Sequence, residues 1–323
     1  MRIAVILGAA FILDLVLGDP NSAWHPICLI GNLISHLEKG LRKLFPKSEK
    51  GELAAGLLLV LLTVTISTAL PAGLLFFCYR LHFAAGLIVE SLLAWLTLAA
   101  RSLKDASMKV CDALEKGDVE EARTAVSMIV GRDTSRLDEA GIARAAIETV
   151  AENSSDGVIA PMLFLALFGA PGACFYKAVN TMDSMVGYTH RKYLYFGRAA
   201  ARLDDLLNFL PSRLSGLLMI AAAFLTGKDG AGALRIFLRD RKKHASPNSA
   251  QTEAACAGAL GIRLAGDAWY FGELHKKEYI GDDTRPVRPS DIRSANLLMY
   301  TATVLCLLIC IGVRLLIWRV RMI

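Results

Sequence analysis

Residues 53–79 read LAAGLLLVLLTVTISTALPAGLLFFCY, and no charged residue interrupts them. This stretch is longer than the roughly 20 residues that a helix needs to cross the hydrocarbon core of a bilayer. The whole chain is 54% hydrophobic with a mean hydropathy of +0.44, which is unusual for a soluble protein. Because 20% of its residues are also charged, polar segments must alternate with apolar ones. We therefore predict an all-α, polytopic helical membrane protein.

Five other apolar segments extend this pattern: 3–17, 83–100, 158–176, 214–226 and 295–318. The segment 158–176 is split by Gly-Ala-Pro-Gly at 169–172, which would break a continuous helix. We predict that 158–180 forms a re-entrant hairpin, with a crossing helix as the alternative. Polar helical blocks lie between the apolar segments, at 101–157, 177–213 and 227–294. We expect all of them to belong to a single membrane-embedded enzyme domain, 1–323.

The remaining bulk features favour or exclude broad classes of protein. Segment 3–17 is predicted to be a retained helix, because Asp14 and LGDP stand where a signal peptide has small cleavage-site residues. The seven cysteines include no CxxC pair, so neither a disulfide framework nor a zinc site is indicated. Basic segments at 38–50, at 239–244 and near the C-terminus favour the cytoplasmic side. They lack interleaved aromatic residues, which argues against nucleic-acid binding.

Polar residues accumulate where block 101–157 meets the apolar segment that follows it. Two helix starts are expected, one capped by Asp118 and one by Ser135. On the second helix Arg144, Glu148 and Glu152 are spaced four residues apart and share a face, which is also the pattern of a solvent-exposed ion-pair ladder. Asn153 and Asp156 continue this polar series. Polar side chains at a membrane boundary are candidates for function.

Block 177–213 holds a second polar constellation, made of Asn180, Asp183, Ser184, Arg202, Asp204, Asp205 and Arg213. Carboxylate and amide oxygens are the ligands that Mg²⁺ prefers, and arginines fit phosphates and carboxylates. Together these residue types predict a site for a metal-bound polyphosphate, with interfacial caps and ion pairs as the alternative.

Two further stretches contribute candidates. Ser246 and Asn248 precede an alanine- and glycine-rich helix whose N-terminus could hold an anion, whereas residues 254–262 read as close helix packing. His25 lies in a turn after the first helix, and a lone histidine is more often structural than catalytic. No G-x-x-x-x-G-K-[ST] phosphate loop occurs in the sequence.

Several motifs in a fixed order together resemble one family. They are LDLVLGDP (13–20), IVGRDTSRLDEAGIARAAIETVAENSSDGVIAP (129–161), NTMDSMVGY (180–188), FGRAAARLDDLLNFLPSRL (196–214) and SPNSAQTEAACAGALG (246–261). They closely resemble the adenosylcobinamide-phosphate synthases of cobalamin biosynthesis, the CobD/CbiB family. Ile27-Cys28 and Ser249-Ala250 depart from the expected pattern, which affects fine substrate contacts and not the family.

The resemblance implies an ATP-dependent, amide-forming ligase in the cell membrane with its active site facing the cytoplasm. It would join a propionate carboxylate of adenosylcobyric acid to (R)-1-amino-2-propanol O-phosphate or a related amino-alcohol phosphate. Other membrane-bound enzymes of late cobalamin biosynthesis are possible partners. A transporter and a Mg²⁺-dependent membrane phosphotransferase are the alternative functions.

The resemblance also suggests roles for the polar residues, with ATP and Mg²⁺ as cofactors. Catalysis is assigned to Glu148, Glu152, Asp156 and His25. Metal binding is assigned to Glu152, Asp156, Asp183, Asp204 and Asp205. Binding of the nucleotide and of substrate phosphates is assigned to Arg132, Asp133, Arg144, Asn153, Asn180, Ser184, Arg202, Arg213, Ser246 and Asn248.

Overall fold

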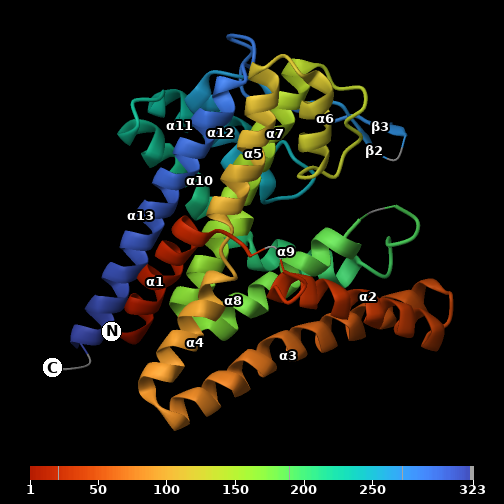
Figure 1. Ribbon diagram of the computed structural model, residues 1–323. Coiled ribbons are helices and arrows are strands. Elements are labelled where there is room, and N and C mark those ends of the chain that lie inside the picture. Colours follow the sequence, from red (N-terminus) through yellow and green to blue (C-terminus); the bar gives the residue numbers. More distant parts are fainter. Residues whose placement is uncertain (21, 189, 271, 321–323) are drawn as a thin grey trace. The chain divides into compact units, whose positions relative to one another are not determined.

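The computed structural model describes residues 1–20, 22–188, 190–270 and 272–320. These residues are mostly helical, which confirms the predicted all-α class (Figure 1). The contacts of the chain group it into two compact units. Unit 1 comprises Met1–Ala99, Ala160–Asn208 and the chain from Ile309 onward, and unit 2 comprises Ala100–Ile159 and Phe209–Leu308. The single domain expected from the sequence stays a prediction.

In the described part of unit 1, all the regular secondary structure is helical. Its elements are α1 (Arg2–Leu17), α2 (Pro26–Leu44), α3 (Glu49–Leu81), α4 (Phe83–Trp95), α8 (Ala160–Val186), α9 (Arg198–Leu207) and the end of α13 (Ser290–Val320). Helices α3 and α4 form a hairpin in Figure 1. His82 joins them, and its Nδ1 accepts a hydrogen bond from the Ala84 backbone N–H at 3.2 Å, which caps α4.

A buried apolar cluster joins α2, α3, α8 and α9. Its fully buried members include Ile34, Leu59, Met182 and Phe196. The charge-free run 53–79 of α3 nevertheless exposes large apolar side chains such as Leu61 and Phe76. Such exposure fits a helix that faces lipid, because hydrocarbon tails are as apolar as the side chains themselves.

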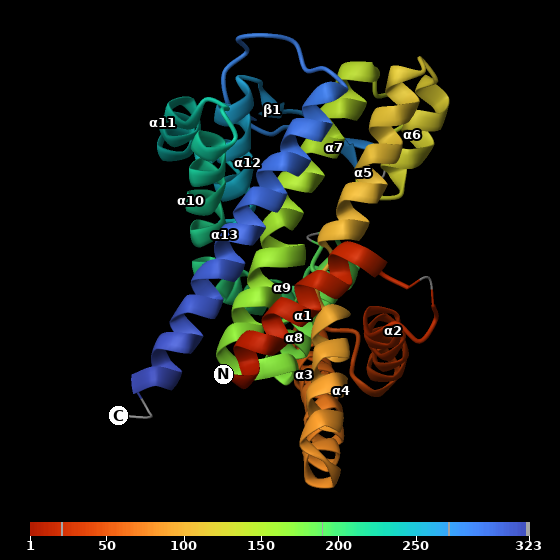
Figure 2. The same cartoon turned by 60° about the vertical axis from the view of Figure 1, so that its left-hand side comes forward.

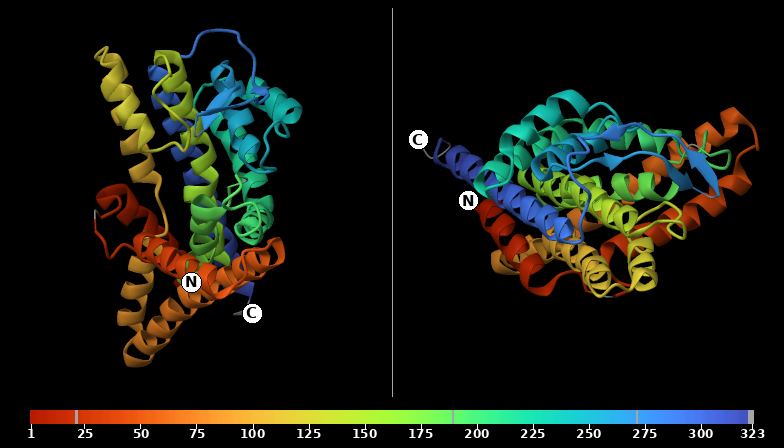
Figure 3. Two further views of the ribbon diagram at one scale, coloured as in Figure 1. Left: turned by 90° about the vertical axis from the view of Figure 1, so that its right-hand side faces the viewer. Right: turned by 90° about the horizontal axis from the view of Figure 1, so that it is seen from above.

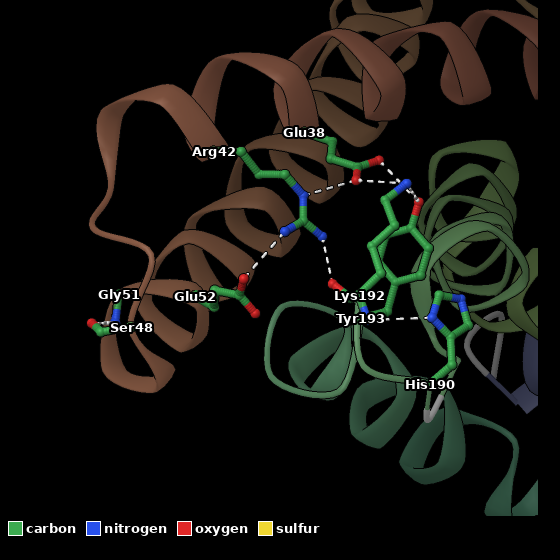
Figure 4. A network of polar contacts seen from close by, with 8 residues as sticks. All are labelled: Glu38, Arg42, Ser48, Gly51, Glu52, His190, Lys192 and Tyr193. Atoms are coloured by element: carbon green, nitrogen blue, oxygen red, sulfur yellow. Dashed lines mark hydrogen bonds and ion pairs between the residues drawn. The ribbon is translucent and has the colours of Figure 1, made fainter.

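Arg42 fastens the polar end of this cluster. Its guanidinium donates to Glu38 on α2 at 2.9 Å, to Glu52 on α3 at 3.4 Å and to the backbone carbonyl of Lys192 at 2.9 Å (Figure 4). Its Cζ atom also lies over the ring of Phe196, 4.2 Å from the ring centroid. Because the Arg42 guanidinium donates to three acceptors at once, it fixes the loop before α9 against the α2–α3 turn.

Unit 2 contains helices and the strands of the molecule's described part. Its elements are α5 (Ala100–Glu115), α6 (Val119–Ser127), α7 (Glu139–Asn153), the π-helical turn η1 (Ser154–Ile159), α10 (Phe209–Leu225), α11 (Gly230–Asp240), α12 (Ser249–Leu260), β1 (Leu264–Ala265), β2 (Ala268–Tyr270), β3 (Glu273–His275), β4 (Tyr279–Ile280) and most of α13. Helices α5, α6 and α7 pack against one another, and so do α10, α11 and α12 (Figure 2).

Two local predictions for unit 2 need correction. Asp118 caps α6 as predicted, accepting from the Glu121 N–H at 2.9 Å. Helix α7, however, is capped by Asp138 and not by Ser135, because the Asp138 carboxylate accepts from the Gly141 N–H at 2.7 Å. Block 227–294 is not helical throughout. Strands β1 and β4 pair antiparallel, as do β2 and β3, and they appear as short arrows in Figure 3.

Four helical stretches are long and apolar enough to cross a membrane: Glu49–Leu81, Phe83–Glu115, Glu139–Val186 and Ser290–Val320. A fifth span is added if α9 and α10 count as one. Helix α8 is interrupted at Gly169, whose φ of 74° only glycine adopts readily, so the break predicted at 169–172 is confirmed. Whether 158–180 crosses or re-enters stays a prediction.

Helix α12 is buried along its whole length, and glycine makes this possible. A Cβ at Gly258 would lie 2.3 Å from the backbone oxygen of Gly232 on α11. The two backbones therefore touch, as the small residues of 254–262 predicted.

Replacing Gly258 by alanine should push α11 and α12 apart. We expect Gly258→Ala to lower the free energy of unfolding by about 1–3 kcal/mol, as overpacking does in other proteins. Thermal unfolding of the purified protein in detergent measures this loss. Gly40→Ala is the matched control, because nothing lies within 4 Å of a Cβ at Gly40 on α2. Equal unfolding temperatures for the two variants would contradict the close contact.

Candidate functional site

Unit 2 contains a polar cavity of about 160 Å³. We call it the acidic cavity, and it is lined by Arg132, Glu148, Glu152, His244, Glu253, Ala265, Gly266, Tyr270 and Lys277. Helix α7 supplies two of the three carboxylates and α12 supplies the third. Arg132 comes from the loop before α7, His244 from the loop before α12, and Lys277 from the segment between β3 and β4. The cavity thus gathers charged side chains from segments far apart in the sequence.

Glu148 is only 4% exposed, and both of its carboxylate oxygens are held. Arg132, in the loop before α7, donates to Oε2 and forms an ion pair. The backbone N–H of Ala265 on β1 donates to Oε1 at 2.6 Å. Burying a carboxylate is tolerated when it is paired and hydrogen-bonded in this way. The alternative interpretation of this face as a solvent-exposed ion-pair ladder is therefore wrong at Glu148, which is buried and pairs with Arg132.

Glu152 lies one turn further along α7 and accepts a hydrogen bond from the Ser249 hydroxyl at 2.7 Å. Ser249 is the first residue of α12. This bond links α7 to the start of α12 beside the acidic cavity. A neutral hydroxyl donor leaves the negative charge of the carboxylate uncompensated, unlike the guanidinium that pairs with Glu148.

Glu253 is 4% exposed, and within the described part of the chain its Oε2 has no hydrogen-bond partner. Burial raises the pKa of its carboxyl well above the ordinary value, and the negative charges of Glu152 and Glu148 raise it further. Glu253 is therefore a stronger base than an ordinary carboxylate once it ionises. Groups with such shifts are suited to proton transfer near neutral pH.

His244 presents a neutral ring to the cavity. Burial lowers the pKa of its imidazole, and the nearby Lys277 charge lowers it as well, although Glu152 opposes both. The Nδ1 atom accepts a hydrogen bond from the Ser246 backbone N–H at 3.0 Å. An Nδ1 that accepts cannot carry the proton, so the neutral ring keeps it on Nε2. His244 is therefore a neutral hydrogen-bond donor at this site.

Other predicted residues of unit 2 hold the surrounding loops. Asp133 accepts from the Gly272 N–H at 2.9 Å and so ties the loop before α7 to the β2–β3 turn. Arg213 donates to the Asn248 side chain at 3.1 Å, which brings two predicted binding residues together. Ser246 accepts from the Asn248 N–H at 3.2 Å.

The last three predicted residues of unit 2 lie on α7 and η1. Asn153 donates to the Thr149 carbonyl at 3.0 Å within its own helix. Arg144 has a buried Nε without a hydrogen-bond partner in the described chain. Asp156 is half-buried in η1.

The residues predicted in block 177–208 lie in unit 1. Among them, Asn180 donates to Asp204 at 3.5 Å, and Asn208 donates to the other oxygen of Asp204 at 2.9 Å. Tyr176 donates to Asn208 at 2.7 Å, which completes a buried polar chain between α8 and α9. Ser184 donates to the Asn180 carbonyl. Asp183 and Asp205 are half-buried, and Arg202 is exposed.

His25 is also in unit 1. It is the N-cap of α2, where its Nδ1 accepts from the Ile27 N–H at 3.3 Å and its Nε2 lies 3.6 Å from Asp19. These contacts give the buried ring a structural role. Its assignment to catalysis stays a prediction.

The predicted metal residues divide between the two units. Glu152 and Asp156 belong to unit 2, whereas Asp183, Asp204 and Asp205 belong to unit 1. Among the described residues, the set close enough to share an ion is Cys111, Asp112 and Glu115. Arg293 already pairs with Glu115 at 2.5 Å and lies 3.7 Å from Asp112. An ion pair therefore accounts for these acidic residues.

Sequence reasoning missed four residues of the acidic cavity: His244, Glu253, Tyr270 and Lys277. Glu253 offered a signal, since it is the one charged residue of an otherwise alanine-rich helix. His244 closes the basic segment 239–244, which was interpreted only by its charge. Tyr270 ends β2 and Lys277 follows β3, and the sequence predicted neither strand.

Comparison with known proteins places the chain among relatives of similar length. A family described as "CobD/Cbib protein" matches residues 7–299. "Cobalamin biosynthesis protein CobD" of Geobacter metallireducens is 51% identical, covering 95% of this chain and 94% of that protein. The protein of the same name from Clostridium perfringens is 43% identical over 97% and 98% of the two chains. "Cobalamin biosynthesis protein CbiB" of Salmonella typhimurium is 46% identical over 94% and 95%. No solved structure matches the chain.

Removing Arg132 should leave the buried negative charge of Glu148 without a charged partner. We expect Arg132→Gln to lower the free energy of unfolding by about 3–5 kcal/mol, as loss of one partner does in other buried pairs. The double variant Arg132→Gln/Glu148→Gln should recover most of this loss, because the amide that replaces the carboxylate carries no charge and can still accept from Ala265. Thermal unfolding of the single and double variants tests the pair. A double variant no more stable than Arg132→Gln would exclude the charge as the cause.

The raised pKa of Glu253 predicts a pH-dependent stability. The folded protein keeps the proton at pH values where the unfolded chain, with an ordinary value of 4.5, has lost it. Stability contributed by this group is thus lost as the pH rises above that value. Glu253→Gln cannot ionise, so its unfolding temperature relative to wild type should increase between about pH 5 and about pH 8.5. Glu139→Gln, an exposed change on α7, serves as the control. A pH-independent difference for Glu253→Gln would contradict the shift.

Proposed function

The chain belongs to the CobD/CbiB protein family, and we propose that it is an amide-forming ligase of cobalamin biosynthesis. It would join a propionate carboxylate of adenosylcobyric acid to (R)-1-amino-2-propanol O-phosphate or a related amino-alcohol phosphate. Support comes from its relatives, which are named cobalamin biosynthesis proteins and match this chain along nearly their whole length. The acidic cavity is the observation that carries the assignment to a reaction.

An amide cannot form directly from a carboxylate and an ammonium ion at a useful rate. The carboxylate is a poor acyl donor, so we propose that ATP converts it to an acyl phosphate and releases ADP. The amine must then lose a proton before its nitrogen attacks the carbonyl carbon. The C–N bond forms as the C–O bond to phosphate breaks, and inorganic phosphate leaves with the electron pair and takes up the second proton that the amine nitrogen loses.

The acidic cavity contains groups for each of these requirements. Glu253 is the proposed base, because a buried carboxylate with a raised pKa accepts the ammonium proton more readily than an exposed one. Glu152 supplies negative charge that attracts the ammonium ion. His244 presents its Nε2–H as a neutral donor, which suits the oxyanion that develops as the amine attacks the carbonyl. Glu148, occupied by Arg132 and Ala265, positions these groups and is not free to react.

We further propose that ATP is bound with Mg²⁺. Mg²⁺ usually takes one or two carboxylates and completes its shell with water and phosphate oxygens. Because Glu152 faces the ammonium ion, the other residues assigned to the metal from the sequence, Asp156, Asp183, Asp204 and Asp205, remain the candidates for such ligands. The ion would neutralise phosphate charge. The polar residues of α8 and α9 remain candidates for binding nucleotide phosphates.

The site is proposed to face the cytoplasm in the cell membrane. The four apolar helices support a membrane protein. The basic segments 38–50 and 239–244 support the orientation, because positively charged loops stay on the cytoplasmic side. The second of these segments ends at His244, which is a residue of the acidic cavity.

The reaction is tested with purified, detergent-solubilised protein, adenosylcobyric acid, aminopropanol phosphate, Mg²⁺ and ATP, with product measured by mass. The expected product has the mass of the amide and requires ATP. Product without ATP would exclude acyl-phosphate activation. No product from any amino-alcohol phosphate would favour a transporter instead.

Glu152→Gln should lower the rate of amide formation by about a hundredfold or more, which is the usual effect of losing a group that acts on the reacting atoms. Glu139→Gln is the control, since it makes the same chemical change at the exposed start of α7. Full activity of a folded Glu152→Gln variant would remove Glu152 from the site.

A further inference from the structure

A second cavity adjoins the acidic cavity in unit 2. It has a volume of about 290 Å³ and is lined by Lys242, Lys243, His244, Ala245, Ala265, Lys276, Lys277 and Glu278. We call it the lysine cavity. The two cavities share His244, Ala265 and Lys277 in their linings, so they adjoin at these residues. Beyond these shared residues, the lysine cavity is lined by three further lysines and Glu278, and the acidic cavity by three carboxylates.

The acidic side carries negative charge that the protein does not neutralise. Arg132 cancels the charge of Glu148, and the Ala265 N–H occupies its second oxygen. Glu152 receives only a hydroxyl hydrogen bond, from Ser249. The Oε2 atom of Glu253 is buried and has no partner in the described chain. An orphaned buried oxygen of this kind is rare and calls for an explanation such as an absent ligand.

The lysine side is partly pre-arranged. Lys277 donates to the Tyr270 hydroxyl at 2.8 Å, and Lys243 pairs with the buried Asp240 at 2.8 Å. Lys242 and Lys276 are exposed at the mouth. Lysine ammonium groups act as compact point charges, which suits the several oxygens of a phosphate.

We propose that the two cavities form one site for a small zwitterion that carries an ammonium group at one end and a phosphate at the other. The ammonium group lies between Glu152 and Glu253, and the phosphate lies among the lysines. This inference rests on the proposed function and deepens it, because an amino-alcohol phosphate has these two charges on neighbouring carbons. The site orients the amine toward carboxylates and keeps the phosphate away from the reacting bond.

The orientation has a chemical consequence. With no ligand, burial and the neighbouring carboxylates raise the pKa of Glu253 and so favour its protonated form. An ammonium ion placed beside it favours the carboxylate form instead. Binding of the zwitterion therefore releases a proton from Glu253 to the solvent, and leaves a carboxylate in position to accept the ammonium proton during amide formation.

Isothermal titration calorimetry on the full-length protein in detergent tests the site without corrinoid or ATP. The probes are 1-amino-2-propanol O-phosphate, 1-amino-2-propanol, which lacks the phosphate, and propan-2-yl phosphate, which lacks the amine. We expect the zwitterion to bind at least about tenfold more tightly than either single-charge probe, because each charge has its own partners. Titrations in buffers of different ionisation enthalpy should show proton release with the two amine-bearing probes and none with propan-2-yl phosphate.

Two variants separate the two ends of the site. Glu253→Gln should weaken the zwitterion about tenfold or more, abolish proton release and leave propan-2-yl phosphate unchanged. Lys277→Gln should weaken both phosphate-bearing probes and leave 1-amino-2-propanol unchanged. Lys116→Gln, an exposed change after α5, is the control. The proposal is overturned if the wild-type protein binds the amine and its phosphate equally well, or if neither variant changes the Kd of the zwitterion.

The two proposals fail differently. If the wild-type enzyme forms the amide but neither variant changes the Kd of the zwitterion, the ligase function is retained and the amine must bind elsewhere. Zwitterion binding with the predicted charge dependence, but without amide product from any corrinoid acid, would retain the site and remove the ligase.

Discussion

The arrangement of unit 2 depends on how one buried carboxylate is satisfied. Glu148 sits on α7 in an environment that exposes 4% of it, where an unpaired charge would cost several kcal/mol. Arg132 and the Ala265 N–H remove that cost from two directions. The same contacts hold the loop before α7 and strand β1 against the helix. The contacts that stabilise the Glu148 carboxylate therefore also position the segments that line the acidic cavity.

The other carboxylates of the cavity have fewer partners than Glu148. This contrast distinguishes Glu148, which has a structural role, from Glu152 and Glu253, which are candidates for function. Glu152 has a neutral partner, and Glu253 keeps a buried oxygen without one in the described chain. Ala265, which supplies the N–H to Glu148, has a φ of 58°, a conformation that residues with a side chain seldom adopt. Strain and unsatisfied groups persist where the surrounding structure enforces them, and they concentrate at functional sites. The α11–α12 contact at Gly258 is one source of that enforcement, because it fixes the helix that carries Glu253.

The sequence predicted what depends on composition and short-range pattern. The charge-free run 53–79 indicated a membrane helix, and Gly169 marked the break in α8, because both depend on local chemistry alone. Glu148 and Glu152 were identified by their spacing on one helix. Their partners were not, because Arg132, Ser249 and Ala265 meet them through tertiary contacts. Tyr270 ends β2 and Lys277 follows β3, and these strands of three residues are too short for a periodic pattern. Glu253 was hidden in a helix whose small residues correctly indicated packing.

The most direct test of the central claim is an experimental structure of the protein with 1-amino-2-propanol O-phosphate bound. Our account predicts phosphate density among the lysines of the lysine cavity, and the ligand nitrogen within hydrogen-bonding distance of Glu253 and Glu152. Glu148 should remain paired with Arg132, since that contact builds the cavity. A ligand bound among the residues of α8 and α9 in unit 1, with the acidic cavity unchanged, would contradict the account.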